Sequence, residues 1–453
     1  MKLVTRHVLA ALIGTVVTFG LAGQMPRDAA AAAGAGTEKK LRVGHTVKRI
    51  VVPGSFCNRD PVPAECQGLR EERPVDVHLW YPADRKGPKT VYRSALYGRT
   101  LIPDRWDPLS WKIEAEKARE APIDRHGKAL PVVVFSHGSM NDPIDYAHTL
   151  ELIAGGGFVV AAPYHVNNTQ DDVRIDYINA QAGTPLFPCN DGRPGPCSRI
   201  NVPRSMDDRV RDIGAILDTL PEWFGDRVDV SRAGILGHSR GTVTALAAAG
   251  GSTQWGFGPL EDRPGQPRVK AIMGMAIGAR PITFGANLAN VRVPALLVAG
   301  GLDQNSVPAI SSDAYGAISS EEKALVTIQH ATHRSFDSTY CAQMQAAGAI
   351  AVKDGERAIL DMHTVTGIAA SPTMGLSGKA VHYCSRDFFT EPVDISPLVQ
   401  AIPGSEFPPS VGAPSVCITT GIPCTGLDTD VVKRAMKDLA VAFFGTVLKR
   451  GGG

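Results

Sequence analysis

A serine stands between two glycines in the stretch GILGHSRGTVTALAAAG, which covers residues 234–250. Ser239 follows a short apolar run and precedes small residues that favour a helix. The flanking glycines would allow a sharp turn and close backbone packing, which a plain strand or helix does not need. A Gly-x-Ser-x-Gly pentad between a strand and a helix exposes its hydroxyl as a nucleophile. We therefore predict that Ser239 attacks a substrate; the alternative is a purely structural turn.

An acid is expected further along the chain, because a serine hydroxyl needs a base and the base needs a carboxylate to orient it. Sites of this kind place the serine, the acid and the histidine in that chain order. In the segment VPALLVAGGLDQNSVP, Asp303 lies in the turn directly after an apolar run. Asp303 is the predicted acid, and its alternative role is to cap that turn.

Two histidines follow the next apolar run, in the segment VTIQHATHRSF. His333 stands further from the strand, where a loop can carry its imidazole over Ser239, so it is the predicted base. His330 closes the apolar run and is expected to pack or hydrogen-bond at its end. The two could instead bind a metal, but they lie in a loop without an evident third ligand. We predict no metal and no cofactor.

Backbone N–H groups are expected to stabilise the negative oxygen of a tetrahedral intermediate. One should come from Arg240, the residue after the nucleophile. The other should come from Ser139, with Met140 as the next choice, in the loop after the apolar run VVVFSHGSM. His137 is expected to shape this loop through a hydrogen bond. Met140 and Trp255 are candidates for substrate contact, although Trp255 also fits ordinary packing.

Short apolar runs alternate with helical patterns along the chain. Continuous runs beginning at residues 130, 156, 232, 269, 293 and 324 are typical of buried parallel strands. Two earlier segments, at residues 41–52 and 73–84, have the β-branched character of strands. The predicted fold class is therefore α/β, with a mostly parallel central sheet covered by helices.

One helix is predicted over SMDDRVRDIGAILDTL, residues 205–220, where apolar residues recur at three- and four-residue steps. Ser205 and Asp208 are expected to cap its start, and Pro221 is expected to end it. The predicted buried stripe consists of Met206, Val210, Ile213, Leu217 and Leu220.

The composition is that of an ordinary globular protein, with 43% hydrophobic and 20% charged residues. The 47 basic and 45 acidic residues interleave without long runs, which argues against a nucleic-acid partner. A positive start, the apolar stretch VLAALIGTVVTFGLAG and small residues predict a signal peptide over residues 1–33, and hence a secreted or periplasmic protein. The alternative is a membrane anchor, but the run is shorter than a span requires. The oligomeric state stays open.

Eight cysteines follow the predicted signal peptide. Disulfides are favoured over a zinc site because no Cys-x-x-Cys pair occurs and the expected compartment is oxidising. The sequence does not fix the pairing, but the neighbours lie in intervals rich in Pro, Gly and Asn. The expected pairs are Cys57 with Cys66, Cys189 with Cys197, Cys341 with Cys384, and Cys417 with Cys424.

Six segments occur in the order seen in a known family: DVHLWYPAD, LPVVVFSHGS, RVRDIGAILDTL, GILGHSRGT, PALLVAGGLDQNSVP and ATHRSF. The chain resembles the dienelactone-hydrolase-like branch of the α/β-hydrolases, which includes platelet-activating-factor acetylhydrolases and, more distantly, secreted polyester hydrolases. This resemblance implies an ester-cleaving serine hydrolase with Ser239, Asp303 and His333 as its triad. Dienelactone hydrolases themselves use a cysteine nucleophile, and Arg240 departs from the apolar residue often found after the serine.

The predicted organisation is a signal peptide over 1–33, an α/β-hydrolase core over 34–340, a cysteine-containing insertion or lid over 341–427, and a helix over 428–453 that returns to the core. The expected function is the cleavage of carboxylic esters through an acyl-enzyme, with a small-molecule, lipid or polyester substrate. An acyltransferase or peptidase on the same scaffold is an alternative, as is a non-catalytic binding protein that retains the fold. The sequence does not identify the ester.

Overall fold

The computed structural model describes most of the chain from residue 41 to residue 339, together with a C-terminal helix. The predicted signal peptide (1–33) and insertion (341–427) lie outside the described residues. The described residues are 41–53, 72–93, 112–139, 141–166, 169, 187–188, 196–197, 204–251, 254–255, 258–259, 265–278, 285–301, 303, 306–328, 331, 333–339 and 429–449.

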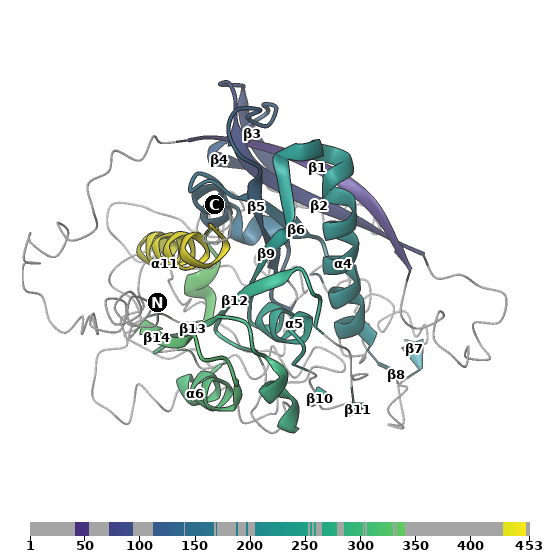
Figure 1. Ribbon diagram of the computed structural model, residues 1–453, viewed down its shortest axis with the longest axis vertical. Coiled ribbons are helices and arrows are strands. Elements are labelled where there is room, and N and C mark those ends of the chain that lie inside the picture. The colour runs from purple at the N-terminus through teal and green to yellow at the C-terminus, as the bar shows by residue number, and fades with distance from the viewer. Residues whose placement is uncertain are drawn as a thin grey trace, which may run out of the picture. The chain divides into compact units, whose positions relative to one another are not determined.

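A ten-stranded sheet forms the centre of the described structure, in the order β14-β13-β12-β9-β5-β6-β2-β1-β4-β3 (Figure 1). The six strands from β14 to β6 pair in parallel, β2 is antiparallel to both of its neighbours, and β3 is antiparallel to β4. The prediction of a mostly parallel sheet is therefore confirmed. The strands are β1 (Arg42–Pro53), β2 (Glu72–Ala83), β3 (Lys89–Arg93), β4 (Lys112–Arg119), β5 (Leu130–Ser136), β6 (Val159–Pro163), β9 (Val228–His238), β12 (Val269–Met275), β13 (Ala295–Gly300) and β14 (Lys323–Ile328).

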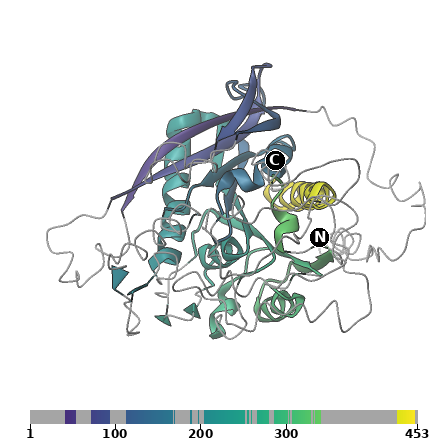
Figure 2. The ribbon, with the colours of Figure 1, turned by 180° about the vertical axis from the view of Figure 1, so that it is seen from behind.

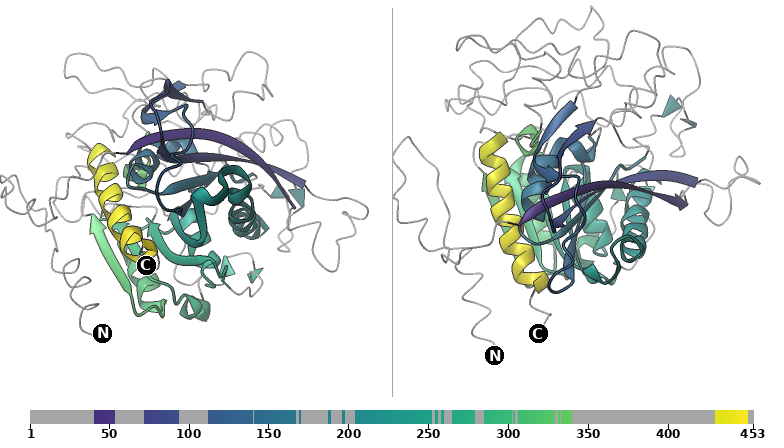
Figure 3. Two further views of the ribbon diagram at one scale, coloured as in Figure 1. Left: turned by 45° about the horizontal axis from the view of Figure 1, so that its top comes forward. Right: turned by 90° about the horizontal axis from the view of Figure 1, so that it is seen from above.

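Helices cover both faces of this sheet, as the end-on view in Figure 3 shows, with α11 in yellow on one side and the teal helices on the other. Helices α4 (Arg204–Phe224), α5 (Arg240–Ala248) and α6 (Pro308–Ala317) pack on one face. Helices α2 (Ala147–Ala154) and α11 (Thr429–Lys449) pack on the other, and α11 is seen from two sides in Figures 1 and 2. Short 3-10 helices are η5 (Pro143–Tyr146), η7 (Gly225–Arg227), η9 (Gly285–Asn290) and η10 (His333–Phe336), and two small ladders are β7 (Phe187–Pro188) with β8 (Pro196–Cys197) and β10 (Gln254–Trp255) with β11 (Gly258–Pro259).

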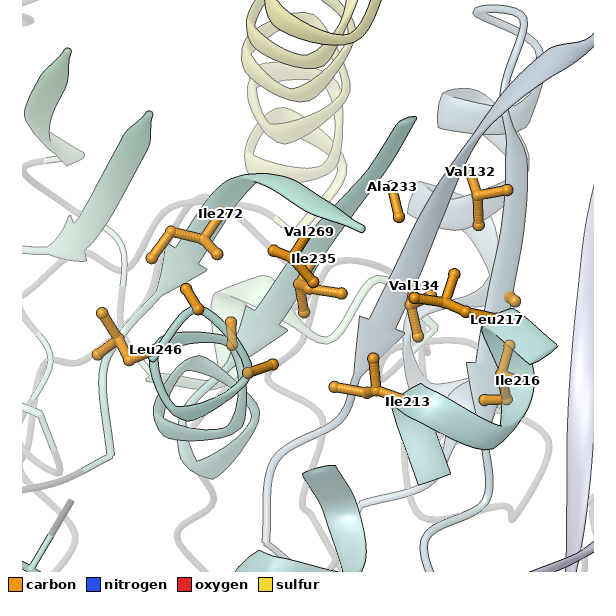
Figure 4. Packing of buried hydrophobic residues seen from close by; sticks show 14 of the residues in the cluster. Val132, Val134, Ile213, Ile216, Leu217, Ala233, Ile235, Leu246, Val269 and Ile272 are labelled. Atoms are coloured by element: carbon orange, nitrogen blue, oxygen red, sulfur yellow. The ribbon is translucent and has the colours of Figure 1, made fainter. Parts of the chain in front are cut away.

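The apolar runs are continuous because alternate residues of each parallel strand face different helices. In β5, Val132 and Val134 pack against α4 and α5, whereas Val133 and Phe135 pack on the side of α2 and α11. Figure 4 shows the first of these cores, to which Val134 of β5 and Ile213 and Leu217 of α4 belong. Because both faces of such a strand are buried, its sequence is an uninterrupted run of apolar residues.

Helix α4 does not end where the sequence predicts. Pro221 lies inside it, and the helix runs on to Phe224. A proline removes one backbone hydrogen bond and crowds the preceding turn. Pro221 is exposed and one turn from the end, so the helix continues for that last turn and passes into η7. The prediction that Pro221 stops this helix is therefore wrong.

The buried face of α4 is also more polar than its apolar stripe suggests. Asp208, Arg209 and Asp212 are buried, with at most 2% of each residue exposed, whereas Val210 is only half-buried. Asp208 pairs with the Arg73 guanidinium (Nε to Oδ1, 3.5 Å), and the helix begins at Arg204, one residue before the predicted cap Ser205. Charged residues on a buried face point to a polar site beneath the carboxyl ends of the strands.

Strands β3 and β4 are absent from the sequence prediction because the sequence of β4, KIEAEKAR, is more typical of a helix. The buried Glu151 of α2 explains the strand. Its carboxylate accepts hydrogen bonds from the backbone N–H groups of Glu116, Lys117 and Ala118, and from the Tyr92 hydroxyl at 2.6 Å. Burial raises the pKa of Glu151, and these donors oppose that rise. A contact distant in sequence therefore fixes β4.

Candidate active site

Ser239 occupies a strained turn between β9 and α5. Its backbone has φ 53° and ψ −120°, a left-handed conformation that residues other than glycine rarely adopt. A Cβ on Gly237 would lie 2.1 Å from the Gly241 carbonyl oxygen, and one on Gly241 would lie 1.8 Å from the Ser136 carbonyl oxygen. Both pentad positions must therefore be glycine, because the start of α5 crosses directly over the ends of β9 and β5. The turn holds Ser239 at the carboxyl edge of the sheet.

Asp303 and His333 meet at the same edge. Asp303 follows β13, His333 begins η10 after β14, and the His333 Nδ1 lies 2.9 Å from the Asp303 Oδ2. The other carboxylate oxygen accepts the Ser306 N–H at 2.7 Å. The Asp303 side chain is fully buried and that of His333 is 14% exposed. Because a carboxylate accepts, Nδ1 of His333 carries the proton, which leaves Nε2 as a base.

The ring of His333 lies over the residue that precedes the serine. Its centroid is 4.7 Å from that of His238, which Phe336 also contacts at 5.6 Å. The segment after η10 is buried and tied to η5 and α2. Thr339 donates its N–H to the Asp145 carbonyl oxygen at 3.0 Å, and the Ser338 hydroxyl accepts the Thr149 N–H at 3.0 Å. These bonds fix the loop that carries the imidazole.

The strand order and the strained turn together identify the fold. A mostly parallel sheet with helices on both faces carries a Gly-x-Ser-x-Gly turn at the carboxyl edge, followed in the chain by an acid and a histidine after later strands. The chain has an α/β-hydrolase fold. In this fold the loop after β5 normally faces the nucleophile and contributes to the oxyanion hole.

The loop after β5 lies against the turn at Ser239. A Cβ on Gly138 would be 3.3 Å from the Cβ of Ser239. On the other side, a Cβ on Gly278 would lie 2.6 Å from the Ser239 Oγ and 2.7 Å from the Arg240 backbone nitrogen. The absence of a side chain at 278 therefore keeps open the space beside both the hydroxyl and the predicted Arg240 donor. No local pattern marks Gly278, which follows β12 and Ala276, a residue with φ 46°.

A buried polar network lies beneath the loop after β5. The Ser136 Oγ is 2.9 Å from Nε2 of His165, whose Nδ1 is 2.8 Å from an Asp212 oxygen, and Arg73 binds the other Asp212 oxygen at 2.8 Å. Burial raises the pKa of Asp212 to about 6, although Arg73 opposes the rise. Burial and then Arg209 lower the pKa of His165. His165 is therefore neutral, with its proton on Nδ1.

His137 has the structural hydrogen bond that the sequence predicts. Its Nδ1 donates to the Gly138 carbonyl oxygen at 2.8 Å, and its Nε2 accepts the His165 N–H at 3.2 Å. The sequence does not predict the hydrogen bond between His238 Nδ1 and the Tyr146 hydroxyl, which is 2.6 Å long. Nothing in the local sequence links these residues, which are 92 positions apart.

Several predicted residues cannot be placed from the described part of the chain. Met140 and His330 lie outside it, and Trp255 belongs to β10 without a described side chain. The eight cysteines also lack described side chains, so the disulfide pairs remain predictions. Among the described residues, no group of three or more His, Cys, Asp or Glu could hold a metal ion, and no helix is long and apolar enough to cross a membrane.

Comparisons with known proteins find similarity to solved structures only. No protein-family model and no curated protein matches the chain. A ferulic acid esterase from Streptomyces cinnamoneus is 17% identical, with 92% of each chain covered and a TM-score of 0.48. A dienelactone hydrolase from Anabaena variabilis is 17% identical, with 67% of this chain and 96% of that chain covered and a TM-score of 0.34. A cold-adapted esterase from an Arctic intertidal metagenomic library is 14% identical, with 64% and 86% covered and a TM-score of 0.34.

Proposed function

We propose that this protein is a serine hydrolase that cleaves carboxylic esters, with Ser239 as nucleophile, His333 as general base and Asp303 as the acid that orients it. The strained turn at Ser239 carries this proposal, because such a conformation persists only when the surrounding structure enforces it. The hydrogen bond between Asp303 and His333, and the position of the His333 ring over His238, support it.

The reaction would proceed in two steps. The Ser239 Oγ attacks the ester carbonyl carbon while Nε2 of His333 takes the hydroxyl proton, and Asp303 stabilises the imidazolium. The N–H groups of Ser139 and Arg240 donate to the negative oxygen of the tetrahedral intermediate. The bond between the carbonyl carbon and the alkoxy oxygen then breaks, and His333 gives its proton to that alkoxy oxygen, so that the alcohol leaves. Water attacks the acyl-enzyme in the same way and releases the acid.

The test compares Ser239→Ala with Ser231→Ala, a substitution in the strand that leads to Ser239. Ser231 lies at the amino end of β9 and is exposed, so Ser231→Ala should keep activity on short-chain p-nitrophenyl esters. Ser239→Ala should lose at least about 1,000-fold in kcat. A fluorophosphonate should label the wild type on the peptide that contains Ser239. Full activity of Ser239→Ala, or labelling elsewhere, would contradict the proposal.

Product analysis separates the hydrolase from an acyltransferase or a peptidase, because all three would share the acyl-enzyme. An ester hydrolase should release free acid from esters in the presence of competing alcohols, and should leave matched amides intact. The proposal includes export of the protein, since residues 1–33 have the pattern of a signal peptide. N-terminal sequencing of the exported protein tests that part separately.

A further inference from the structure

Arg209 is a buried arginine that binds the loop predicted to supply the oxyanion hole. It extends from α4, and none of its surface is exposed. Its Nη1 donates to the His137 carbonyl oxygen at 2.6 Å and to the Ser136 hydroxyl at 3.2 Å. Its Nη2 donates to the Gly138 carbonyl oxygen at 3.3 Å. One guanidinium therefore holds two consecutive carbonyl groups of the loop after β5.

These bonds orient the peptide groups of the loop. In a planar trans peptide, the carbonyl and the N–H of the next residue point in opposite directions. The Gly138 carbonyl also accepts from His137 Nδ1 at 2.8 Å and from the Asn141 N–H at 3.4 Å. A carbonyl held by three donors sends the Ser139 N–H away from Arg209. The preceding N–H, that of Gly138, is already committed to the Tyr146 hydroxyl at 3.3 Å.

A buried guanidinium needs neighbours that compensate for its lost hydration. Burial and then the neighbouring Arg240 lower the pKa of Arg209, while Asp212 opposes that change. The bonded chain from Arg209 through Ser136 and His165 to Asp212 extends to Arg73, and all five residues are at most 2% exposed. Replacing such a buried ionic group with apolar residues is often neutral or even stabilising. The position of this group under one loop therefore suggests a role beyond stability.

We propose that Arg209 is a positioning residue that aims the Ser139 N–H at the oxyanion, with Ser136 bonded to its guanidinium and His165 and Asp212 holding Ser136 in place. This inference rests on the proposed ester hydrolysis at Ser239. Arg209 does not touch the substrate. It acts by fixing the Gly138 carbonyl, and through it the direction of the donor.

The first experiment compares Arg209→Gln with Arg227→Gln. Arg227 is also buried and donates to the backbone carbonyls of Asp124, His126, Gly127 and Lys128, at the opposite end of β5. Both variants should unfold at lower temperature. Only Arg209→Gln should lose kcat, by about 100-fold with KM little changed, because a misplaced oxyanion donor weakens the transition state alone. Arg209→Lys, which keeps the charge but cannot span two carbonyls, should recover part of the rate.

Equal losses of kcat in the Arg209 and Arg227 variants, or a loss confined to KM, would overturn the inference. If the Arg209 variants do not fold, a crystal structure of the phosphonate adduct of the wild type tests the inference instead. The expected adduct has the phosphoryl oxygen bonded by the Ser139 N–H, with Arg209 on both carbonyls. An adduct on Ser239 without that bond would refute the role of Arg209 and leave the nucleophile intact. Failure to form any adduct on Ser239 would instead refute the proposed function.

Discussion

Two buried arginines hold the loops at opposite ends of strand β5. Arg227 donates to four carbonyls of the loop before the strand, and Arg209 donates to two carbonyls of the loop after it. The local chemistry is the same, since each guanidinium donates to several backbone carbonyls of one loop. The surroundings differ. Residues 125–128 are exposed, whereas residues 136–138 are buried beside Ser239.

One kind of interaction therefore serves two purposes in this protein. At the amino end it closes a turn, and its value is stability. At the carboxyl end it holds peptide groups next to a strained nucleophile, and under the proposal a change in their direction matters as much as a change in stability. Variants made in pairs, one at each end, test this distinction.

The largest contrast is expected between Asp303→Asn and Asp229→Asn. Asp303→Asn should lose about 1,000- to 10,000-fold in kcat, because the amide no longer holds the proton on Nδ1 of His333. Asp229 bonds Arg232 at the amino end of β9, so Asp229→Asn should stay within about twofold of the wild type. Ester hydrolysis assays measure both. A mild effect of Asp303→Asn would remove Asp303 from the triad.

The next contrast is between two glycine substitutions. Gly278→Ala should lose about 100- to 1,000-fold in kcat/KM and also lower the Tm, since its Cβ would lie 2.6 Å from Ser239 Oγ and 2.7 Å from the Arg240 backbone nitrogen. Gly127, in the loop before β5, has φ 84° and nothing within 4 Å of a Cβ. Gly127→Ala should therefore keep full activity and lose about 1 kcal/mol of stability through backbone strain. Full activity of Gly278→Ala would show that the space beside Ser239 is not where esters react.

A third contrast concerns the pH dependence of stability. Asp212, whose pKa burial raises to about 6, binds its proton more tightly in the folded state than its ordinary value of 3.8 allows. The stability of the wild type minus that of Asp212→Asn should therefore fall, by about 2–3 kcal/mol, as the pH rises from about 4 to 6. Partial burial tends to raise the pKa of Asp229, but Ser231 and Arg232 outweigh it and lower that pKa. The corresponding difference for Asp229→Asn should fall only as the pH drops below about 4.

Urea titrations at each pH measure both differences. Because each wild-type curve is compared with a single-site variant, the titration of other carboxylates cancels. A flat Asp212 difference between pH 4 and 6 would mean that this carboxyl is better solvated than its burial indicates.

The smallest contrast is a difference in stability between two inactive variants of Ser239. Glycine accepts the φ of 53° found at Ser239, whereas alanine does not. Both substitutions abolish the hydroxyl, but Ser239→Gly should be more stable than Ser239→Ala by about 1 kcal/mol. Thermal unfolding of the two inactive variants measures the strain that the wild type stores at this turn. Equal stabilities would indicate that the turn relaxes when the hydroxyl is lost.

The parallel strands and the Ser239 turn were predictable because their signals are local. Each parallel strand is a short apolar run, and a pentad with two close-packed glycines needs no distant partner to be noticed. Asp303 and His333 could be proposed because each follows such a run. Strands β3 and β4 could not, since β4 has a helix-like sequence and is held as a strand by its pairing with β1 and β3 and by the Glu151 carboxylate.

Arg209 and Gly278 carry no local signal of their role. In the sequence, Arg209 is one charge in an amphipathic helix whose predicted apolar stripe passes through Val210, and nothing in that pattern indicates that its side chain is buried. The fold rotates Arg209 and Asp212 beneath β5, where Ser136 and His165 complete the network. Gly278 matters only because the chain after β12 passes within contact of Ser239.

The amino-acid sequence alone was enough to predict the parallel strands of the sheet, the glycine-flanked turn at Ser239, and the order in which an acid and a histidine follow. These depend on hydrophobic periodicity and backbone sterics, which act over a few residues. The tertiary structure was needed to find that Arg209 holds the loop beside Ser239 and that Gly278 keeps space open next to its hydroxyl. Such roles depend on contacts between segments far apart in the chain, such as Arg73 and Asp212, which are 139 positions apart, and no local pattern encodes those contacts.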